Sequence, residues 1–163
     1  MFSDALKAQA QALLENCRKR GVKIATAESC TGGLISGCLT EVAGSSDVVD
    51  RGFVTYSNEA KIELINVPAG LIEEFGAVSE DVARAMAEGA LEGSRADYAV
   101  SVTGVAGPGG GTASKPVGLV HMACSRRDRP TLHERHVFAG DRSQVRKQTV
   151  VRALRLLDEA VTG

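Results

Sequence analysis

Tryptophan is absent from this sequence of 163 residues, and only two tyrosines and four phenylalanines supply aromatic rings. Proteins that bind single-stranded nucleic acids without sequence preference stack the bases on several such rings. The formal net charge of −1 adds no general attraction for polyanions. We therefore expect no nucleic-acid binding.

Long apolar runs and paired cysteine motifs are also missing. No stretch reaches the ~18 apolar residues that a membrane span needs, and residues 1–20 lack the apolar core of a signal peptide. The four cysteines, Cys17, Cys30, Cys38 and Cys124, form neither a CxxC pair nor a zinc-ligand spacing. We therefore expect reduced thiols in a cytoplasmic protein, with no membrane association and no metal site.

The residues that are present fit an ordinary folded domain. Charged residues make up 24% of the chain, which argues against disorder, and the length suits one domain spanning residues 1–163. Basic residues gather near the C-terminus, where nine of them and three acidic residues lie between Arg126 and Arg155. This imbalance leaves room for one localised anion site.

Apolar periodicity and turn residues predict helices that alternate with strands. The predicted strands cover residues 22–27, 52–57, 98–103, 117–125 and 131–138, and the last two form an antiparallel hairpin with a turn at 126–130. The first predicted helices cover residues 3–20 and 31–42, followed by one from 58 or 59 to before Pro68 and one over 69–75. Two further helices follow: one is capped by Ser79, and the last begins with a capping box of Asp141 and Gln144. This order predicts a three-layer α/β/α sandwich, with a mixed, mainly parallel sheet of about five strands.

The first candidate site segment covers residues 27–33 and runs from a strand end into a helix. Ligands bind at such junctions because the N–H groups at a helix start are free, and Gly32 and Gly33 allow a close approach. Ser29 could therefore be a nucleophile, with neighbouring N–H groups stabilising an oxyanion. Alternatively, Ser29 and Thr31 merely cap the helix.

The second candidate segment covers residues 56–61, where another strand turns into a helix. Tyr56 and Lys61 could project into one crevice, and a lysine held against an apolar wall loses pKa and can act as a general base. Alternatively, Tyr56 is a core ring and Lys61 a solvated helix residue.

Cysteine and histidine offer weaker candidates for nucleophilic catalysis. Cys30 stands beside Ser29, but its apolar neighbours and the lack of a nearby histidine favour a packed thiol. His121, His133 and His136 all fall in the predicted hairpin and suggest neither a triad nor a metal site.

The third and fourth candidate segments could bind a ligand. Residues 103–112 form a glycine-rich loop that matches neither a Walker loop nor the G-x-G-x-x-G spacing, so it either follows the contour of a small polar ligand or is a flexible connector. Arg142 and Arg146 lie one helical turn apart beside the predicted helix start, an arrangement that suits a phosphate. Surface ion pairs, with Asp141 or Glu134, are the alternative for these arginines.

Together, these segments resemble the CinA C-terminal domain family. The resemblance covers essentially the whole chain and rests on AESCTGG, GFVTYSNEAK, FGAVS, TGVAGPGGGTASKPVG and GDRSQVR, in that order. Stand-alone members are nicotinamide-nucleotide amidases of the PncC type, so the resemblance implies hydrolysis of nicotinamide mononucleotide to nicotinate mononucleotide and ammonia. It implies a serine amidohydrolase with no metal or organic cofactor. Longer members carry an additional pyrophosphatase-type domain, and we do not expect that activity here.

The resemblance also implies roles for individual residues. Ser29 would be the nucleophile, with Tyr56 and Lys61 as its activating partners. The expected substrate contacts are Thr31, Gly32, Gly33, Asn58, Thr103, Gly104, Gly107, Arg142 and Arg146.

A different class of function keeps the same pocket. The chain could be a non-catalytic nucleotide-binding module, or an interaction module linked to competence or DNA damage, as the family name suggests. Such a module needs no ionisable partner for Ser29. In either case we expect a homo-oligomer, with a dimer as the guess.

Overall fold

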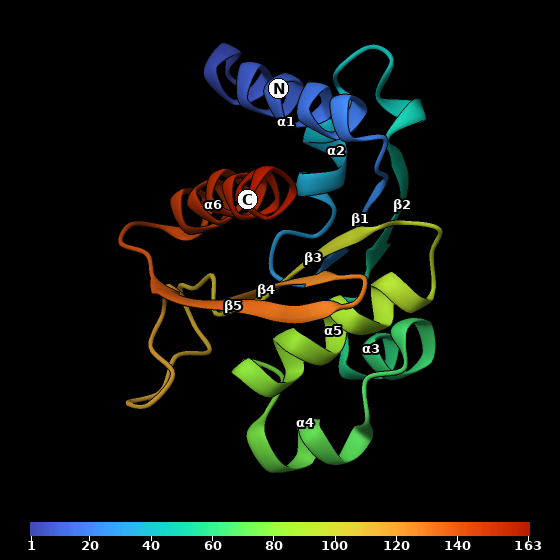
Figure 1. Ribbon diagram of the computed structural model, residues 1–163. Helices are drawn as coiled ribbons and strands as arrows, with labels where there is room; N and C mark the ends of the chain where they lie inside the picture. The colour runs from blue at the N-terminus through green and yellow to red at the C-terminus, as the bar shows by residue number, and fades with distance from the viewer.

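A five-stranded sheet runs through the computed structural model, which describes residues 1–163 (Figure 1). The spatial order is β2-β1-β3-β4-β5, with bounds β1 Ile24–Glu28, β2 Val49–Val54, β3 Tyr98–Gly104, β4 Leu119–Arg126 and β5 Arg129–Val137. β1 pairs in parallel with β2 and β3, whereas β4 is antiparallel to both β3 and β5. Only β4 therefore points against the others, and the predicted mixed, mainly parallel sheet with one hairpin is confirmed.

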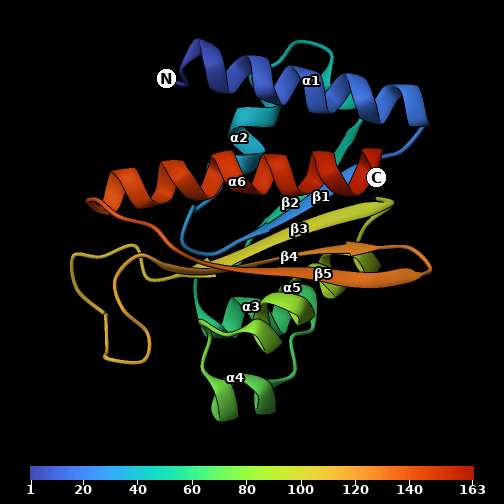
Figure 2. The ribbon, with the colours of Figure 1, turned by 60° about the vertical axis from the view of Figure 1, so that its left-hand side comes forward.

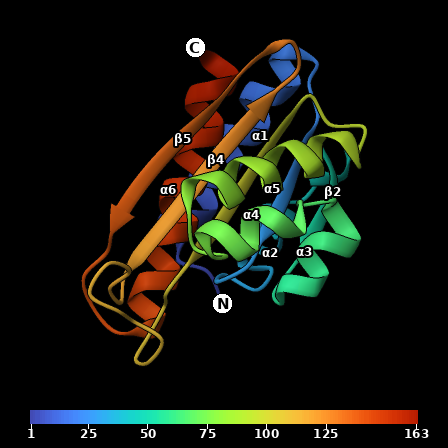
Figure 3. The same cartoon turned by 90° about the horizontal axis from the view of Figure 1, so that it is seen from below.

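Helices cover both faces of this sheet (Figure 2). One layer holds α1 Asp4–Arg20, α2 Leu34–Thr40 and α6 Arg142–Thr162, and the other holds α3 Asn58–Ile65, α4 Ala69–Phe75 and α5 Glu80–Glu92. A short 3₁₀ turn, Ser45–Asp47, precedes β2. In Figure 3 the second layer lies in front of the sheet. The predicted three-layer α/β/α sandwich is therefore confirmed.

Alternating side chains on the strands divide the core between the two layers. Val100 and Val102 of β3 belong to the cluster that packs with α1 and α6, whereas Ala99 packs with α5. Gly89 brings α5 against the end of α3, because a Cβ at this position would lie 1.9 Å from the Ile65 carbonyl oxygen. This close contact packs α3 against α5.

The largest differences from the predicted boundaries lie at α2, β2 and the hairpin turn. Helix α2 begins three residues later than predicted, because Gly32 and Gly33 adopt φ of 58° and 102° and turn the chain before the helix starts. Strand β2 lies earlier, at Val49–Val54, where it pairs with β1. The hairpin turn is shorter than predicted, and Pro130 lies within β5, where an edge strand tolerates its missing N–H.

Candidate active site

Ser29 stands at the carboxyl end of β1, in the turn that leads to α2. Its N–H donates to the Val102 carbonyl oxygen at 3.1 Å, and its own carbonyl oxygen accepts the Gly32 N–H at 3.1 Å. The residue is 8% exposed. The central sheet therefore holds the backbone of Ser29 in place at the edge where ligands of α/β proteins bind.

The carboxylate of Glu28 fixes the other side of this turn. It accepts hydrogen bonds from the Thr31 hydroxyl at 2.5 Å, the Ile35 N–H at 2.8 Å and the Ser36 N–H at 3.0 Å. These bonds satisfy free donors at the start of α2 with a negative charge, which a helix N-terminus stabilises. Glu28 is a functional residue that the sequence patterns do not predict; its place directly before Ser29, at the end of a buried strand, is the only signal.

Lys61 reaches Ser29 from the opposite helix layer. Ser57 caps α3 by accepting the Ala60 N–H, and Lys61 follows in the first turn with 1% exposure. The Nζ atom donates to Ser29 Oγ at 3.1 Å and to the carbonyl oxygens of Thr55 at 2.9 Å and Tyr56 at 3.3 Å. The predicted meeting of Lys61 with Ser29 is thus present in the structure.

The surroundings of Lys61 favour its neutral amine. Burial lowers the pKa of Lys61 because the ammonium form loses its hydration, and the nearby Cys30 thiol opposes this shift to a smaller extent. The three acceptors are hydroxyl and carbonyl oxygens, not carboxylates. A neutral amine that contacts a hydroxyl group can accept its proton.

Tyr56 and Arg142 form the outer wall of the site. The Tyr56 ring is 62% exposed, and its hydroxyl accepts a hydrogen bond from Arg142 Nη2 at 3.3 Å. Arg142 Nη1 donates to the Gly107 carbonyl oxygen at 2.7 Å, which ties the glycine-rich loop to the start of α6. A cavity of about 170 Å³ lies between these groups, lined by Ser29, Cys30, Tyr56, Gly104, Ala106 and Arg142.

The glycine-rich loop has specific anchors at both ends, so it is more than a loose connector. In Figures 2 and 3 it projects beside the N-terminal end of α6. Lys115 donates to the Phe75 carbonyl oxygen at the end of α4. Gly107 has φ of 85°, and a Cβ there would lie 2.5 Å from the Val117 side chain, so this position requires glycine.

Several residues expected at the substrate lie elsewhere. The Thr31 hydroxyl is buried and bonded to Glu28, and the Thr103 hydroxyl is buried and donates to the Ala77 carbonyl oxygen at 2.9 Å. In this structure both hydroxyls bond to the protein's own side chain or backbone, and their contact with a substrate stays a prediction. Asn58 is exposed at the start of α3 and does not line the cavity.

Arg146 contacts the Ser29 turn from the α6 layer. Its Nε donates to the Cys30 carbonyl oxygen at 3.1 Å, and its Nη2 donates to the Thr31 carbonyl oxygen at 3.2 Å. Gly32 lies nearby, since a Cβ on it would be 3.6 Å from Arg146 Nη2. The arginine thus meets the backbone of the turn and does not line the cavity.

Cys30 is a packed residue, as the sequence analysis favoured. Burial raises the pKa of the Cys30 thiol to about 12, so the nucleophilic thiolate is not formed near neutral pH. All four cysteines are buried and unpaired.

No three His, Cys, Asp or Glu side chains lie together where they could hold a metal ion. None of the helices combines the length and the apolar character of a membrane span.

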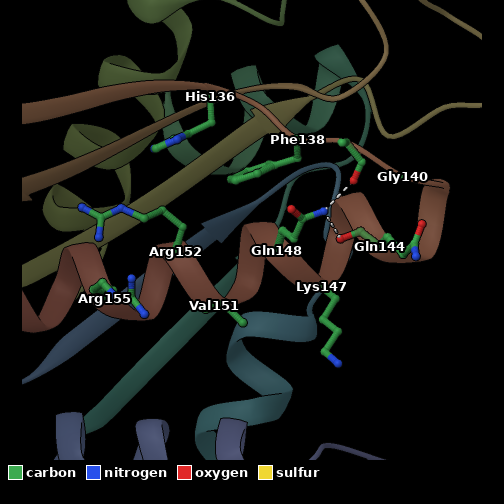
Figure 4. Close-up of a pocket in the computed structure, with 10 residues that line it drawn as sticks. His136, Phe138, Gly140, Gln144, Lys147, Gln148, Val151, Arg152 and Arg155 are labelled. Atoms are coloured by element: carbon green, nitrogen blue, oxygen red, sulfur yellow. Dashed lines mark hydrogen bonds between the residues drawn. The ribbon is translucent and has the colours of Figure 1, made fainter.

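A wider groove of about 790 Å³ lies between β5 and α6 (Figure 4). His136 and Phe138 stack along its wall with ring centroids 5.1 Å apart. Arg152 lines the groove but is paired with Glu134 and with Glu159. The groove contains no nucleophile with an activating base, whereas the smaller cavity at Ser29 brings a hydroxyl and an amine together.

A family model and a solved structure both match nearly the whole chain. The sequence model described as "CinA C-terminal domain" matches residues 6–161. A crystal structure of "competence/damage inducible protein CihA" from Agrobacterium tumefaciens superposes with a TM-score of 0.96 at 48% identity, covering 100% of this chain and 99% of that one.

Two curated relatives differ in length. The Escherichia coli K12 protein named "Nicotinamide-nucleotide amidohydrolase PncC" is 49% identical over 140 residues, which cover 86% of this chain and 85% of that protein. A "CinA-like protein" from Syntrophobacter fumaroxidans is 49% identical over 148 residues, or 91% of this chain but only 35% of that protein. The chain thus spans about a third of the longer relatives that it matches.

Proposed function

The chain belongs to the CinA C-terminal domain family, and on this premise we propose that it hydrolyses nicotinamide mononucleotide to nicotinate mononucleotide and ammonia. The observation that carries the proposal is the 3.1 Å contact between Lys61 Nζ and Ser29 Oγ at the end of β1. The similarity to the PncC protein of Escherichia coli supports the choice of substrate.

The proposed reaction begins with a proton transfer from Ser29 Oγ to the neutral Lys61 amine. The serine oxygen attacks the carboxamide carbon and forms a tetrahedral intermediate with a negatively charged oxygen. When the C–N bond breaks, Lys61 returns the proton to the departing nitrogen, which leaves as ammonia. Water, deprotonated by Lys61, then attacks the ester on Ser29 and releases the nicotinate product and the free serine.

We assign the phosphate of the substrate to Arg142. This arginine lines the cavity, lies in the first turn of α6 and keeps an exposed side chain. A helix N-terminus and a guanidinium group both favour a phosphate. Tyr56 closes the same wall and would orient the substrate or assist proton transfer through its hydroxyl. Gly104, Gly32 and Gly33 would contribute backbone rather than side-chain contacts.

The remaining expectations stay predictions. We propose a cytoplasmic homo-oligomer, taken as a dimer, that acts without a metal or organic cofactor and does not bind nucleic acids. The alternative function is a non-catalytic nucleotide-binding or competence-linked module, and such a module does not require the contact between Lys61 and Ser29.

A substrate panel tests the proposal directly. Purified protein is incubated with nicotinamide mononucleotide, nicotinamide riboside and nicotinamide, and the released ammonia is measured. We expect turnover of the mononucleotide and much slower turnover of the two compounds without phosphate. Binding of the mononucleotide without ammonia release would favour the non-catalytic module, and preference for another amide would identify a different amidase.

A further inference from the structure

We infer that Arg146 is a positioning residue that holds the Ser29 turn in its reactive conformation and does not bind the substrate phosphate. The inference rests on the proposed function, because it assigns Arg146 a part in the serine chemistry. It revises the role that the sequence resemblance implied for this residue.

The contacts of Arg146 already occupy one edge of its guanidinium group. Nε and Nη2 form one of the two pairs of parallel donors with which arginine binds an oxyanion in bidentate fashion. Here the same two atoms donate to the Cys30 and Thr31 carbonyl oxygens at 3.1 and 3.2 Å. Arg142, one helical turn earlier, lines the cavity instead.

Peptide geometry shows what these two bonds accomplish. The C=O of one residue and the N–H of the next lie in one plane and, in a trans peptide, point in opposite directions. The only cis peptide of the chain is Gly107–Pro108, so the Cys30–Thr31 peptide is trans. Holding the Cys30 carbonyl toward Arg146 therefore directs the Thr31 N–H away from it.

The peptide that Arg146 holds belongs to the turn that carries Ser29. Inside the turn the Gly32 N–H is bonded to the Ser29 carbonyl oxygen, and from outside Arg146 donates to the carbonyl oxygens of Cys30 and Thr31. Without Arg146 the Cys30 carbonyl oxygen loses this donor, and the peptide is free to turn. Such a movement would shift the Ser29 hydroxyl from its 3.1 Å contact with Lys61 Nζ, and the rate depends on this geometry.

Steady-state kinetics and Ser29 labelling test the inference on the full chain. We expect Arg146→Ala to lower kcat for nicotinamide mononucleotide by about 100-fold, the scale of a ~1 Å misplacement of reacting groups, and to change KM less than about threefold. A small fluorophosphonate should label Ser29 more slowly by a similar factor. Guanidinium ion at millimolar concentration should restore part of both rates. The matched control is Lys147→Ala, an exposed cation on the next residue of α6, which should leave both rates unchanged.

Other outcomes are equally decisive. If Arg146→Ala raises KM more than tenfold and leaves kcat and the labelling rate unchanged, Arg146 is a phosphate ligand and the inference is overturned. Wild-type values of KM, kcat and the labelling rate would also overturn it. If the alanine variant does not fold, Arg146→Lys takes its place. It keeps the charge but cannot reproduce the paired planar donors, so it should lower kcat and the labelling rate to a smaller degree. If the wild type releases no ammonia from the mononucleotide, the proposed substrate fails, and the labelling rates alone then decide on Arg146.

Discussion

A lysine side chain is rarely buried without an acidic partner, yet Lys61 is 1% exposed and meets only neutral oxygen atoms. A lysine with only a structural role would contribute little stability at this position, because burial disfavours the charged form of its amine. The same burial suits the proposed role of Lys61 as general base for Ser29, because the lowered pKa increases the fraction of neutral lysine that can accept a proton.

Replacement of Lys61 should therefore impair chemistry more than binding. We expect Lys61→Ala to lower kcat by about two to four orders of magnitude, the usual range for a lost general base. Lys61→Arg should not restore it, since a guanidinium group does not release its proton at working pH. Lys19→Ala, an exposed lysine of α1, is the control. Near-normal kcat in Lys61→Arg would make Lys61 an electrostatic anchor.

The pH dependence of the reaction should follow the same group. Because only the neutral amine acts as the base, kcat/KM should rise with pH and level off above the pKa of Lys61. The midpoint should lie below the ordinary lysine value of 10.5, since burial lowers this pKa. A pH–rate profile of the wild type measures it. A profile that falls with rising pH through this range would contradict the assignment.

Sequence patterns predict the residues that we propose to be catalytic, but not the residues that hold them in place. Ser29 and Lys61 lie at strand-to-helix junctions, which periodicity and turn residues reveal. Glu28 and the backbone carbonyl of Thr55 act through contacts between distant segments, which no local pattern encodes. Thr31 and Thr103 were assigned to the substrate because a motif does not tell which way a hydroxyl points.

Among the elements, α6 combines a stabilising N-terminal cap with the arginine that we propose to bind the phosphate. Asp141 accepts the Gln144 N–H, and the Gln144 side chain accepts the Asp141 N–H in return. The cap lies directly before Arg142. Asp141→Ala should therefore cost about 1 kcal/mol of folding stability and also raise KM for the mononucleotide.

The cap of α1 provides the matched comparison. Ser3 accepts the Leu6 N–H at 3.2 Å; it lies near Ser143 and Arg146 but does not line the cavity that contains Arg142. Ser3→Ala should lower the free energy of unfolding by a similar amount, measured by urea denaturation, and leave KM unchanged. Equal KM in both variants would show that the α6 cap does not position Arg142.

Element types followed from the sequence better than element ends did. The capping box and the span of α4 were predicted at the observed residues, because caps and proline act locally. The start of α2 was not, because the left-handed glycines before it serve the Ser29 turn and not the helix. The register of β2 depends on pairing with β1, which a single segment does not specify.

For the molecule as a whole, the pair of buried His121 and half-buried His133 should make folding stability sensitive to acid. His121 and His133 stack with their ring nitrogens 2.9 Å apart, and Glu80 lies 3.6 Å from His133. Burial, followed by the charges of His133 and Arg135, lowers the pKa of His121 to about 4; Lys115 acts in the same sense and Glu80 opposes it.

The sign of the effect follows from proton binding. Between pH 6.5 and about 4 the unfolded chain binds a proton at His121 that the native state does not, so stability falls as the pH falls. Thermal unfolding from pH 7.5 to 4.5 should show a decreasing Tm. His121→Gln should flatten this slope, and an unchanged slope in that variant would place the acid sensitivity elsewhere. Glu134, whose pKa is lowered to about 2 by Arg152, loses its contribution only at lower pH, below about 4.5.

The central claim is that Ser29 attacks the amide of a nicotinamide nucleotide, and ammonia release by Ser29→Ala tests it most directly. Removing a serine nucleophile leaves binding largely intact, so we predict a loss of about four orders of magnitude or more in kcat, with nicotinamide mononucleotide still bound in a calorimetric titration. Ser46→Ala, an exposed serine away from the cavity, should behave as the wild type. Ammonia release by Ser29→Ala within tenfold of the wild-type rate would contradict the account.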